Sequence, residues 1–266
     1  MIKTFFKTKQ LYSLFLIFAV CSSFIIFKKE KPVFYIIGDS TVHNGDGTGS
    51  NGQWGWGSFI ADYFDTTKLG VQNLAMGGRS SRTFITEGRW NKILATLKKG
   101  DYVIMQFGHN DGGPLDDTAR ARGTIRGIGN ESKEIYNPIT KKNEVVYTYG
   151  YYMRKYVRDC KAKKAIPIIC SPIPRNEWQN GKVQRSDSSY SGWAKAIAEQ
   201  EGAYFINLND LVALKYEEIG AEKVKSFFPA DHTHTDINGA KLNAGIVVNS
   251  LAALTPGKLR KYILNK

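Results

Sequence analysis

The sequence is poor in cysteine, and its cysteines are not spaced as metal ligands or as a disulfide framework. Only Cys21, Cys160 and Cys170 occur in 266 residues, with no Cys-x-x-Cys pair and no cluster of cysteine and histidine at zinc spacing. Cys160 lies in a helical pattern and Cys170 in a strand pattern, so the two could pair in an oxidising compartment or remain buried free thiols. A chain of this length buries enough apolar surface to fold without disulfides.

Two ligand-binding motifs are present in outline but lack essential parts. Gly47, Gly49 and Gly52 have the spacing of a dinucleotide-binding fingerprint, but they do not directly follow a strand and no apolar helix pattern begins within them. The loop from Asn44 begins like a calcium-binding loop, but Gly55 stands where the twelfth, acidic ligand is required. Neither a dinucleotide nor a calcium ion is therefore expected as a ligand.

Acidic residues are also scarce relative to basic ones. There are 24 Asp and Glu against 37 Lys and Arg, which gives a formal net charge of +13 and a pI of about 9.5. The electrostatic field of such a positive charge attracts nucleic acid, a membrane surface or an acidic polymer. No nucleic-acid-reading motif and no single basic helix is visible, so nucleic acid is not the expected partner. We expect a monomer that binds an acidic polymer.

The first 31 residues differ in character from the rest. Three lysines precede an apolar run from Leu11 to Phe27, and a basic stretch that ends at Pro32 follows it. This pattern is typical of an export signal, so we assign residues 1–31 to a signal peptide or membrane anchor and residues 32–266 to the folded domain. Cleavage near residues 21–23, lipid attachment at Cys21 and a retained anchor are the alternatives. The protein is expected in the periplasm, outside the cell or anchored on its envelope.

From Val33 onward, apolar strand patterns alternate with helical ones. Strands are expected at Val33–Ile37, Val71–Ala75, Asp101–Phe107, Ala165–Cys170 and Tyr204–Ile206, and helices at Ser58–Phe64, Trp90–Lys98, Tyr151–Lys163, Ser191–Gln200, Leu208–Ile219 and Gly239–Leu251. This alternation predicts a single three-layer α/β/α domain with a mainly parallel sheet, whose strand-end loops share one rim. Residues 114–149 are polar and carry a hairpin signal around Pro138–Asn143, and we interpret them as an insertion on that rim.

The best candidate nucleophile follows the first strand. The apolar run ends in Gly38-Asp39-Ser40-Thr41, which would place a small hydroxyl at the carboxyl end of a buried strand, where the chemistry of α/β sheets gathers. A turn made of ordinary turn residues is the alternative. A serine nucleophile needs an imidazole to take its proton and a carboxylate to orient that imidazole. The rest of the chain can be searched for both.

The chain has only four histidines that could act as the base: His43, His109, His232 and His234. In a turn, the carboxylate of Asp231 can reach over three residues to the ring of His234, whereas the adjoining His232 tends to diverge from it. We therefore choose His234 as the base. A polar loop in which Asp236 caps the following helix is the alternative interpretation.

Donors for an oxyanion are found after two further strands. Gly78 follows the second strand, and a glycine lets its N–H approach a ligand closely. Asn110 follows the third strand and has an amide that donates without titrating, and the Ser40 N–H would be the third donor. Each residue taken alone is explained by a turn. Their joint position at predicted strand ends favours a catalytic site.

Together these segments resemble the SGNH, or GDSL, hydrolases. The resemblance rests on Gly38-Asp39-Ser40, Gly78, Gly108-x-Asn110 and Asp231-x-x-His234. The longer stretches Ala75–Arg82, Phe107–Asp111, Pro172–Asn176 and Asp231–Thr235 are similar to the rhamnogalacturonan acetylesterases within that superfamily. The similarity runs from about Val33 to Leu254. The serine is not in a Gly-x-Ser-x-Gly motif, so the sharp elbow of the α/β-hydrolases is not expected, and Gly77 stands where alanine is expected.

The resemblance implies a flavodoxin-like fold with no metal and no cofactor. It implies Ser40 as nucleophile, His234 as general base and acid, and Asp231 as the carboxylate that orients the imidazole. It also implies an oxyanion hole made by Gly78, Asn110 and the Ser40 amide.

The resemblance further implies an esterase that removes acetyl groups from an acidic plant polysaccharide, above all the pectic polymer rhamnogalacturonan. Arg79 and Arg175 would pair with carboxylates and Trp54 would stack on a sugar, unless the arginines are solvated and the tryptophan lies in the core. An esterase for another acylated glycan or lipid, and a non-catalytic glycan-binding envelope protein, are the alternatives. The complete triad argues against the non-catalytic one.

Overall fold

A computed structural model describes residues 30–254 and 256–264 of the chain. The expected export segment, residues 1–31, lies outside the described residues except for its last two, and Cys21 lies outside them as well. Residues from Pro32 on form one compact unit. Among the helices of the described ranges, none is both long and apolar enough to cross a membrane.

Five parallel strands form the central sheet. They are β1 (Val33–Gly38), β2 (Gly70–Asn73), β3 (Tyr102–Gln106), β6 (Ile166–Cys170) and β9 (Tyr204–Ile206), in the order β2-β1-β3-β6-β9. Taken in order of appearance this is 2-1-3-4-5, the order of a flavodoxin-like sheet. The predicted parallel α/β fold is confirmed. The carboxyl ends of all five strands lie at one rim.

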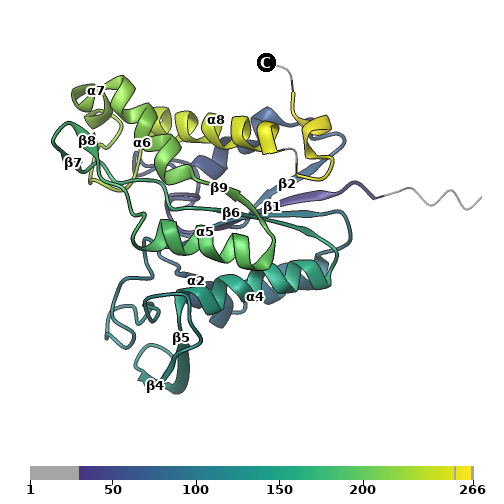
Figure 1. The fold of residues 1–266 in the computed structure, drawn as a ribbon, viewed down its shortest axis with the longest axis vertical. Coiled ribbons are helices and arrows are strands. Elements are labelled where there is room, and N and C mark those ends of the chain that lie inside the picture. The colour runs from purple at the N-terminus through teal and green to yellow at the C-terminus, as the bar shows by residue number, and fades with distance from the viewer. Residues whose placement is uncertain (1–29, 255, 265–266) are drawn as a thin grey trace, which may run out of the picture. The chain divides into compact units, whose positions relative to one another are not determined.

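Helices cover both faces of the sheet, as Figure 1 shows. One layer contains η2 (Trp56–Tyr63), α6 (Leu208–Ile219), α7 (Ala221–Lys225), α8 (Ile237–Leu254) and η3 (Leu259–Tyr262), and the other contains α2 (Ser81–Thr86), α3 (Arg89–Thr96), α4 (Tyr149–Ala162) and α5 (Tyr190–Glu201). Successive residues of β1 face opposite layers: Phe34 and Ile36 pack into the first core, Tyr35 and Ile37 into the second. This period of two explains why the strands read as continuous apolar runs.

Several predicted elements differ in extent or kind. The helix expected at Ser58–Phe64 is a 3₁₀ helix, η2, which begins at Trp56. A short helix, α2, was not expected; Ser80 and Thr83 cap its start reciprocally. Helix α8 begins two residues earlier than expected, because Asp236 accepts a hydrogen bond from the Gly239 N–H (2.8 Å) and caps it.

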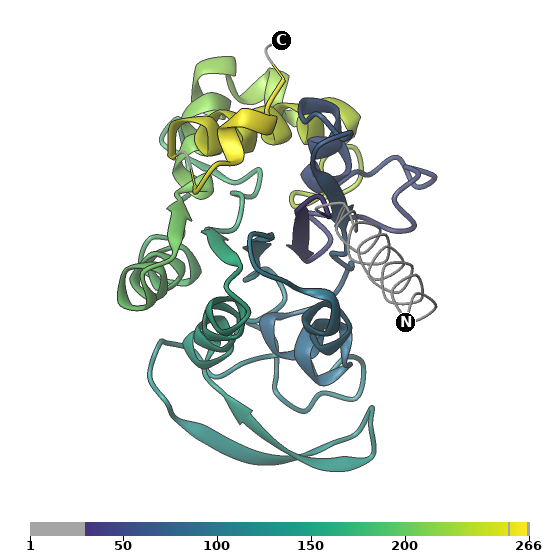
Figure 2. The same ribbon diagram turned by 90° about the vertical axis from the view of Figure 1, so that its right-hand side faces the viewer.

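The predicted insertion is an excursion that contains an antiparallel hairpin, β4 (Ser132–Asn137) and β5 (Lys142–Tyr147). Figure 2 shows it beyond the layer that contains α4. A second, smaller hairpin pairs β7 (Trp178–Gln179) with β8 (Lys182–Val183). Cys160 on α4 and Cys170 on β6 are both buried and both free, so the alternative of a disulfide between them is wrong.

A buried arginine fastens the insertion to the sheet domain. The Arg82 side chain is fully buried, and its guanidinium donates to both carboxylate oxygens of Glu144 at 2.7 Å. The same guanidinium donates to the backbone oxygens of Leu115 (2.9 Å) and Gly123 (2.8 Å). Because every acceptor belongs to the insertion, Arg82 of α2 determines where that segment sits.

Candidate active site

Ser40 lies in a turn at the carboxyl end of β1, and a hydrogen-bond network fixes that turn. The buried Asp39 carboxylate accepts from the Thr41 N–H (2.9 Å) and hydroxyl (2.7 Å). The Thr41 hydroxyl accepts from the Gln106 amide of β3 (2.6 Å), and Gln106 in turn accepts from the Trp56 indole (3.0 Å). The serine is therefore carried on a rigid connection between β1, β3 and η2.

The three predicted triad residues lie in one hydrogen-bonded chain. Ser40 Oγ is 2.8 Å from His234 Nε2, and His234 Nδ1 is 2.7 Å from Asp231 Oδ2. The other carboxylate oxygen of Asp231 accepts from the backbone N–H groups of Thr233 (2.6 Å) and His234 (2.8 Å). This arrangement holds the Nδ1–H tautomer of the imidazole and leaves Nε2 as a proton acceptor for the serine.

The electrostatics of Asp231 suit a permanently charged orienting group. Partial burial acts to raise the pKa of its carboxyl, but hydrogen bonds from the His234 ring and from the backbone of His234 and Thr233 outweigh burial and lower the pKa to about 2. The Gln53 amide also donates to this carboxylate (3.3 Å). Asp231 is thus ionised at every pH at which a histidine acts as a base.

Two loops hold the histidine loop next to the serine. The Trp54 N–H donates to the Thr235 backbone oxygen at 2.7 Å, directly after His234. On the other side, the Asn176 N–H donates to the His232 backbone oxygen at 2.8 Å. The glycine-rich loop after β1 and the loop after β6 thus clamp the segment that carries the base.

The predicted oxyanion donors line the same cavity as Ser40. Gly78 has a φ of +79°, which favours glycine, and a Cβ on the preceding Gly77 would lie 3.5 Å from Ser40 Cβ. Asn110 is 7% exposed, and its side chain donates one amide hydrogen to the Arg79 backbone oxygen (2.9 Å), which leaves the second hydrogen for a ligand. Within the described residues, the Ser40 and Gly78 N–H groups have no hydrogen-bond partner.

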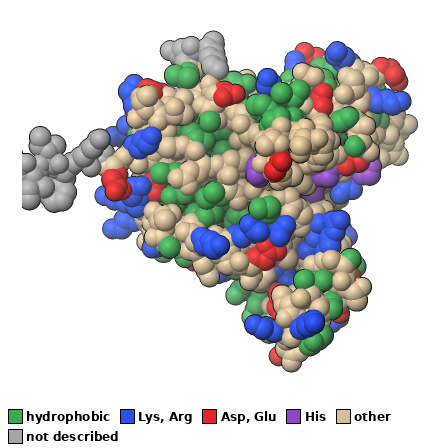
Figure 3. All heavy atoms as spheres, turned by 180° about the vertical axis from the view of Figure 1, so that it is seen from behind, with side chains coloured by type: hydrophobic (Ala, Val, Ile, Leu, Met, Phe, Trp, Pro, Cys, Tyr) green, Lys and Arg blue, Asp and Glu red, His purple; other side chains and the backbone are tan. Residues whose placement is uncertain are grey.

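These groups open into a cavity of about 870 Å³ that is rich in arginine. Arg79, Arg120, Arg122 and Arg175 all line it. Arg79 is paired with Glu87 (3.0 Å), whereas the other three have no carboxylate within ion-pair distance among the described residues. Figure 3 shows Lys and Arg side chains gathered beside histidines on this face. The cavity therefore favours an anionic ligand.

Of the three arginines without a carboxylate partner among the described residues, Arg122 contacts the backbone of the predicted oxyanion donor Gly78. It is half-buried, and its guanidinium donates to the Gly78 backbone oxygen at 3.1 Å. Burial lowers the pKa of the Arg122 guanidinium, and the neighbouring charge of Arg120 lowers it further, while nearby carboxylates act in the opposite direction. A ligand carboxylate would relieve the unfavourable burial of this charge.

The carboxyl group of Asp111, the residue after Asn110, has an unusually high pKa. Asp111 is fully buried and accepts hydrogen bonds from the Ser81 N–H (3.1 Å) and hydroxyl. Burial raises the pKa of Asp111 to about 7, although the hydrogen bonds from Ser81 act to lower it. The group therefore changes charge near neutral pH.

Of the other predicted binding residues, the two arginines line the cavity and the tryptophan does not. Arg175 and Arg79 line the cavity, but the Arg79 charge is already compensated by Glu87. Trp54 is not among the lining residues: its ring packs 5.2 Å from that of Phe59 and against the core. The expected stacking of Trp54 on a sugar is therefore not supported, and its backbone positions the histidine loop instead.

Sequence reasoning missed four residues of this site: Gln53, Gln106, Arg120 and Arg122. Gln53 and Gln106 act through hydrogen bonds to residues 178 and 65 positions away, which no local pattern reveals. Arg120 and Arg122 lie in the insertion, whose polar sequence has no periodicity to indicate which side chains face the cavity. The only available signal was the position of this segment on the active rim.

The sequence matches one known protein family and is similar to two named proteins. The family model described as the GDSL-like lipase/acylhydrolase family matches residues 36–234, a span that contains Ser40 and His234. The chain is 35% identical over 211 residues to a rhamnogalacturonan acetylesterase of Emericella nidulans, covering 79% of this chain and 80% of that one. It is 30% identical over 226 residues to the probable rhamnogalacturonan acetylesterase YesY of Bacillus subtilis, covering 83% and 92%.

A solved structure shares the fold. The crystal structure of YxiM from Bacillus subtilis superimposes with a TM-score of 0.68 at 28% sequence identity. The match covers 85% of this chain but 57% of that protein, so the chain spans little more than half of YxiM.

Proposed function

The chain belongs to the GDSL-like lipase/acylhydrolase family and is a carboxylic ester hydrolase, and we propose that it is a serine acetylesterase that acts on an acidic plant cell-wall polysaccharide, rhamnogalacturonan. The observation that carries the proposal is the chain of hydrogen bonds from Ser40 through His234 to Asp231 inside a cavity rimmed by uncompensated arginines.

The reaction follows from the positions of these groups. Ser40 Oγ attacks the acetyl carbonyl while His234 Nε2 takes its proton, and the negative charge on the carbonyl oxygen meets the N–H groups of Ser40 and Gly78 and the free amide hydrogen of Asn110. His234 then gives the proton to the departing sugar oxygen, leaving an acetylated Ser40. Water attacks this ester with His234 again as base, and acetate and free Ser40 result.

The charge of the cavity and the relatives together support the substrate. The relatives in Emericella nidulans and Bacillus subtilis carry rhamnogalacturonan acetylesterase in their names. The galacturonate units of such a polymer bear carboxylates, for which Arg120, Arg122 and Arg175 offer partners. A neutral xylan would leave these guanidinium groups uncompensated. A polymer of this size meets the enzyme only outside the cell, which agrees with the expected export.

The test is acetate release from a panel of polymers by the wild-type enzyme. Acetylated rhamnogalacturonan, homogalacturonan and xylan are compared at equal acetyl content. Hydrolysis of p-nitrophenyl acetate measures the general esterase activity of the enzyme. We expect preferential release from rhamnogalacturonan. Preference for xylan would overturn the acidic substrate and keep the esterase, and hydrolysis of p-nitrophenyl acetate alone would overturn the polysaccharide assignment.

A further inference from the structure

A second cavity, of about 280 Å³, adjoins the one that contains Ser40. Its walls come from the end of β3, the loop after β6, the segment between β8 and α5, and Tyr190 at the start of α5. His109 and Arg175 line both cavities, so the two share a wall. A ligand long enough to pass this wall would occupy both.

Two buried polar atoms of this cavity have no partner. Within the described residues, His109 Nε2 and Tyr190 Oη are inaccessible to solvent and make no hydrogen bond, and both residues line the cavity. The Thr124 hydroxyl lies near Tyr190 but forms no hydrogen bond of normal geometry with it, and is directed at the Asp111 backbone oxygen (3.4 Å). Buried groups of this kind are usually satisfied, so each requires an explanation.

The position of Tyr190 is fixed by its surroundings. Its ring lies 5.2 Å from that of Tyr149 and 4.8 Å from that of Trp193, in edge-to-face contacts. Gly108 has a φ of +146°, and a Cβ there would lie 3.1 Å from Tyr190 Cβ and 2.6 Å from Pro172 Cγ. Because ring and backbone are packed this closely, the hydroxyl cannot turn away to find a partner elsewhere.

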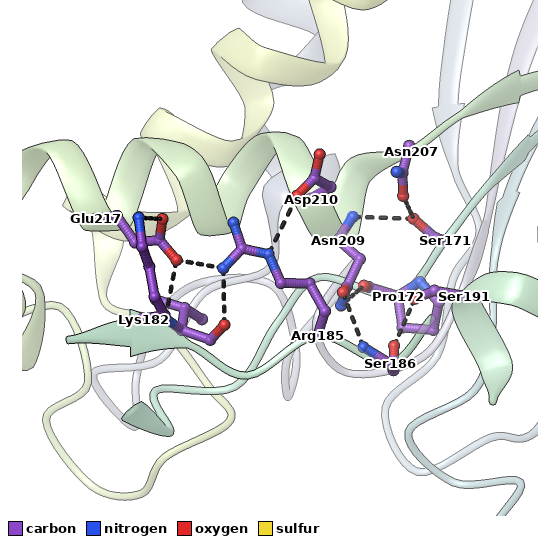
Figure 4. A network of polar contacts seen from close by, with 11 residues as sticks. Ser171, Pro172, Lys182, Arg185, Ser186, Ser191, Asn207, Asn209, Asp210 and Glu217 are labelled. Atoms are coloured by element: carbon purple, nitrogen blue, oxygen red, sulfur yellow. Dashed lines mark hydrogen bonds and ion pairs between the residues drawn. The ribbon is translucent and has the colours of Figure 1, made fainter. Parts of the chain in front are cut away.

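Three other polar residues of the wall, Arg185, Ser186 and Asn209, belong to a network of polar contacts, as Figure 4 shows. Arg185 is held between Asp210 (3.1 Å) and Glu217. Asn209 accepts from the Ser186 N–H (3.1 Å) and donates to the Pro172 backbone oxygen (2.8 Å). This network fixes that part of the wall, and it includes neither the imidazole of His109 nor the phenol of Tyr190.

The charge of the second cavity differs from that of the first. Arg185 is compensated by two carboxylates, and the carboxylate of Glu177 also lines this cavity, where it lies 3.5 Å from His232 Nε2. Burial lowers the pKa of the His109 imidazole and so favours its uncharged form, which presents one donor and one acceptor nitrogen. A neutral imidazole and a phenol are suited to hydroxyl groups, which both donate and accept.

We propose that the second cavity binds a neutral sugar unit that adjoins the acetylated unit of the same polysaccharide chain, with hydrogen bonds from its hydroxyls to Tyr190 Oη and His109 Nε2. Arg175 then stands at the junction between an acidic unit in the first cavity and a neutral unit in the second. This subsite rests on the proposed function. With this subsite the enzyme recognises both the acetylated sugar and the sugar unit next to it.

The test removes one oxygen atom from the cavity. Tyr190→Phe deletes the hydroxyl and keeps the packed ring, and Tyr136→Phe makes the same change on the exposed hairpin (60% exposed) as a matched control. For each variant and the wild type, kcat and KM are measured on acetylated rhamnogalacturonan oligosaccharides, on O-acetylated galacturonic acid and on p-nitrophenyl acetate. Comparison across the three substrates separates the subsite from the catalytic centre.

We expect Tyr190→Phe to raise KM for the oligosaccharides about threefold to tenfold, the effect of one hydrogen bond. The ratio of kcat/KM on the oligosaccharides to that on the monosaccharide should fall by the same factor, and Tyr136→Phe should keep the wild-type ratio. An unchanged ratio in Tyr190→Phe, alone or with a lowered melting temperature, would overturn the subsite and assign the cavity to bound water. Failure of the wild type on every polysaccharide would overturn the proposed function as well.

Discussion

Ser40 Oγ lies 2.8 Å from His234 Nε2, although 194 residues separate the two along the chain. The fold brings them together because β1 delivers the serine to the rim of the sheet and two loops clamp the histidine segment against it. The contact already has the length of a normal hydrogen bond, so the proposed proton transfer from Ser40 to His234 requires no rearrangement of the protein.

Replacement of the nucleophile should abolish catalysis without unfolding the protein. Ser40→Ala removes a half-buried hydroxyl outside the core, and we expect kcat on p-nitrophenyl acetate to fall at least about 10⁴-fold. The melting temperature should stay within about 2 °C of the wild type. Steady-state kinetics and thermal unfolding by circular dichroism measure both, and substantial activity in the variant would contradict the assignment of the nucleophile.

The two neighbouring histidines provide a matched comparison. His234 contacts the serine, whereas His232 is directed at Glu177 (3.5 Å) and Arg175. His234→Ala should lower kcat about as much as loss of the serine, because triad members act as a unit. His232→Ala should change kcat less than about tenfold. If His232→Ala were the more damaging change in the same assay, the choice of base would be wrong.

Arg122 should contribute to affinity for acidic substrates. Arg122→Gln removes a charge that has no carboxylate partner among the described residues, and we expect KM for acetylated rhamnogalacturonan to rise about tenfold, since charged hydrogen bonds contribute about 1.5–3 kcal/mol. The effect on p-nitrophenyl acetate should be much smaller, and added salt should reduce the difference. Arg260→Gln, an exposed arginine of η3, is the control. Equal losses on both substrates would instead show that Arg122 supports the oxyanion loop.

Asp111 should make stability depend on pH in the neutral range. Its folded pKa of about 7 lies above the unfolded value of about 3.9, so the folded state holds a proton that the unfolded chain releases. The resulting stability is fully present below about pH 4 and is lost as the pH rises through about 7, at up to about 1.4 kcal/mol per pH unit. Asp111→Asn cannot ionise and should escape this loss.

Thermal unfolding of wild type and Asp111→Asn between pH 5 and pH 8 tests this expectation. The melting temperature of the variant relative to the wild type should rise with pH over that range. Asp116→Asn, which changes an exposed carboxyl of the same loop, should show no such trend. A pH-independent difference for Asp111→Asn would mean that the buried carboxyl does not titrate near neutrality.

The buried pair of Arg82 and Glu144 should dominate the stability of the insertion. Glu144→Gln leaves the fully buried Arg82 without its counter-charge, and we expect the free energy of unfolding to fall by about 3 kcal/mol. Glu134→Gln, on the exposed face of the same hairpin, should change it by less than about 0.5 kcal/mol. Urea denaturation compares the two, and similar losses would contradict a special role for the pair.

The sequence predicted the sheet and the triad for related reasons. The five strands are short apolar runs bounded by turn residues, and residues that follow parallel strands must meet at one rim, so Ser40, Gly78 and Asn110 could be grouped without coordinates. Asp231 and His234 are close in sequence, and their contact is a local turn. These features depend on local patterns together with one rule of topology.

What escaped prediction depends on the direction in which isolated side chains face. Trp54 lies in a polar glycine-rich loop, where its sequence context suits a sugar platform and a core contact equally; the structure packs it on Phe59. The fully buried Arg82 likewise reads as a surface residue, since nothing local shows that Glu144, 62 positions later, supplies its counter-charge. In both cases tertiary contacts determine the direction in which the side chain faces.

The part of the insertion that contains the hairpin, residues 126–147, leaves and rejoins the rest of the chain at neighbouring points. Ile125 and Thr148 form a parallel bridge, in which the Ile125 N–H donates to Tyr147 (3.0 Å) and the Tyr149 N–H donates to Ile125 (2.9 Å). A loop whose ends already meet can change in length at little entropic cost. Residues 126–147, which border the cavity through Ile139, therefore form an exchangeable cassette. Its transfer between homologous scaffolds requires that the incoming segment supply a carboxylate for Arg82 and backbone acceptors for Arg154, whose guanidinium donates to Ile128 and Gly129.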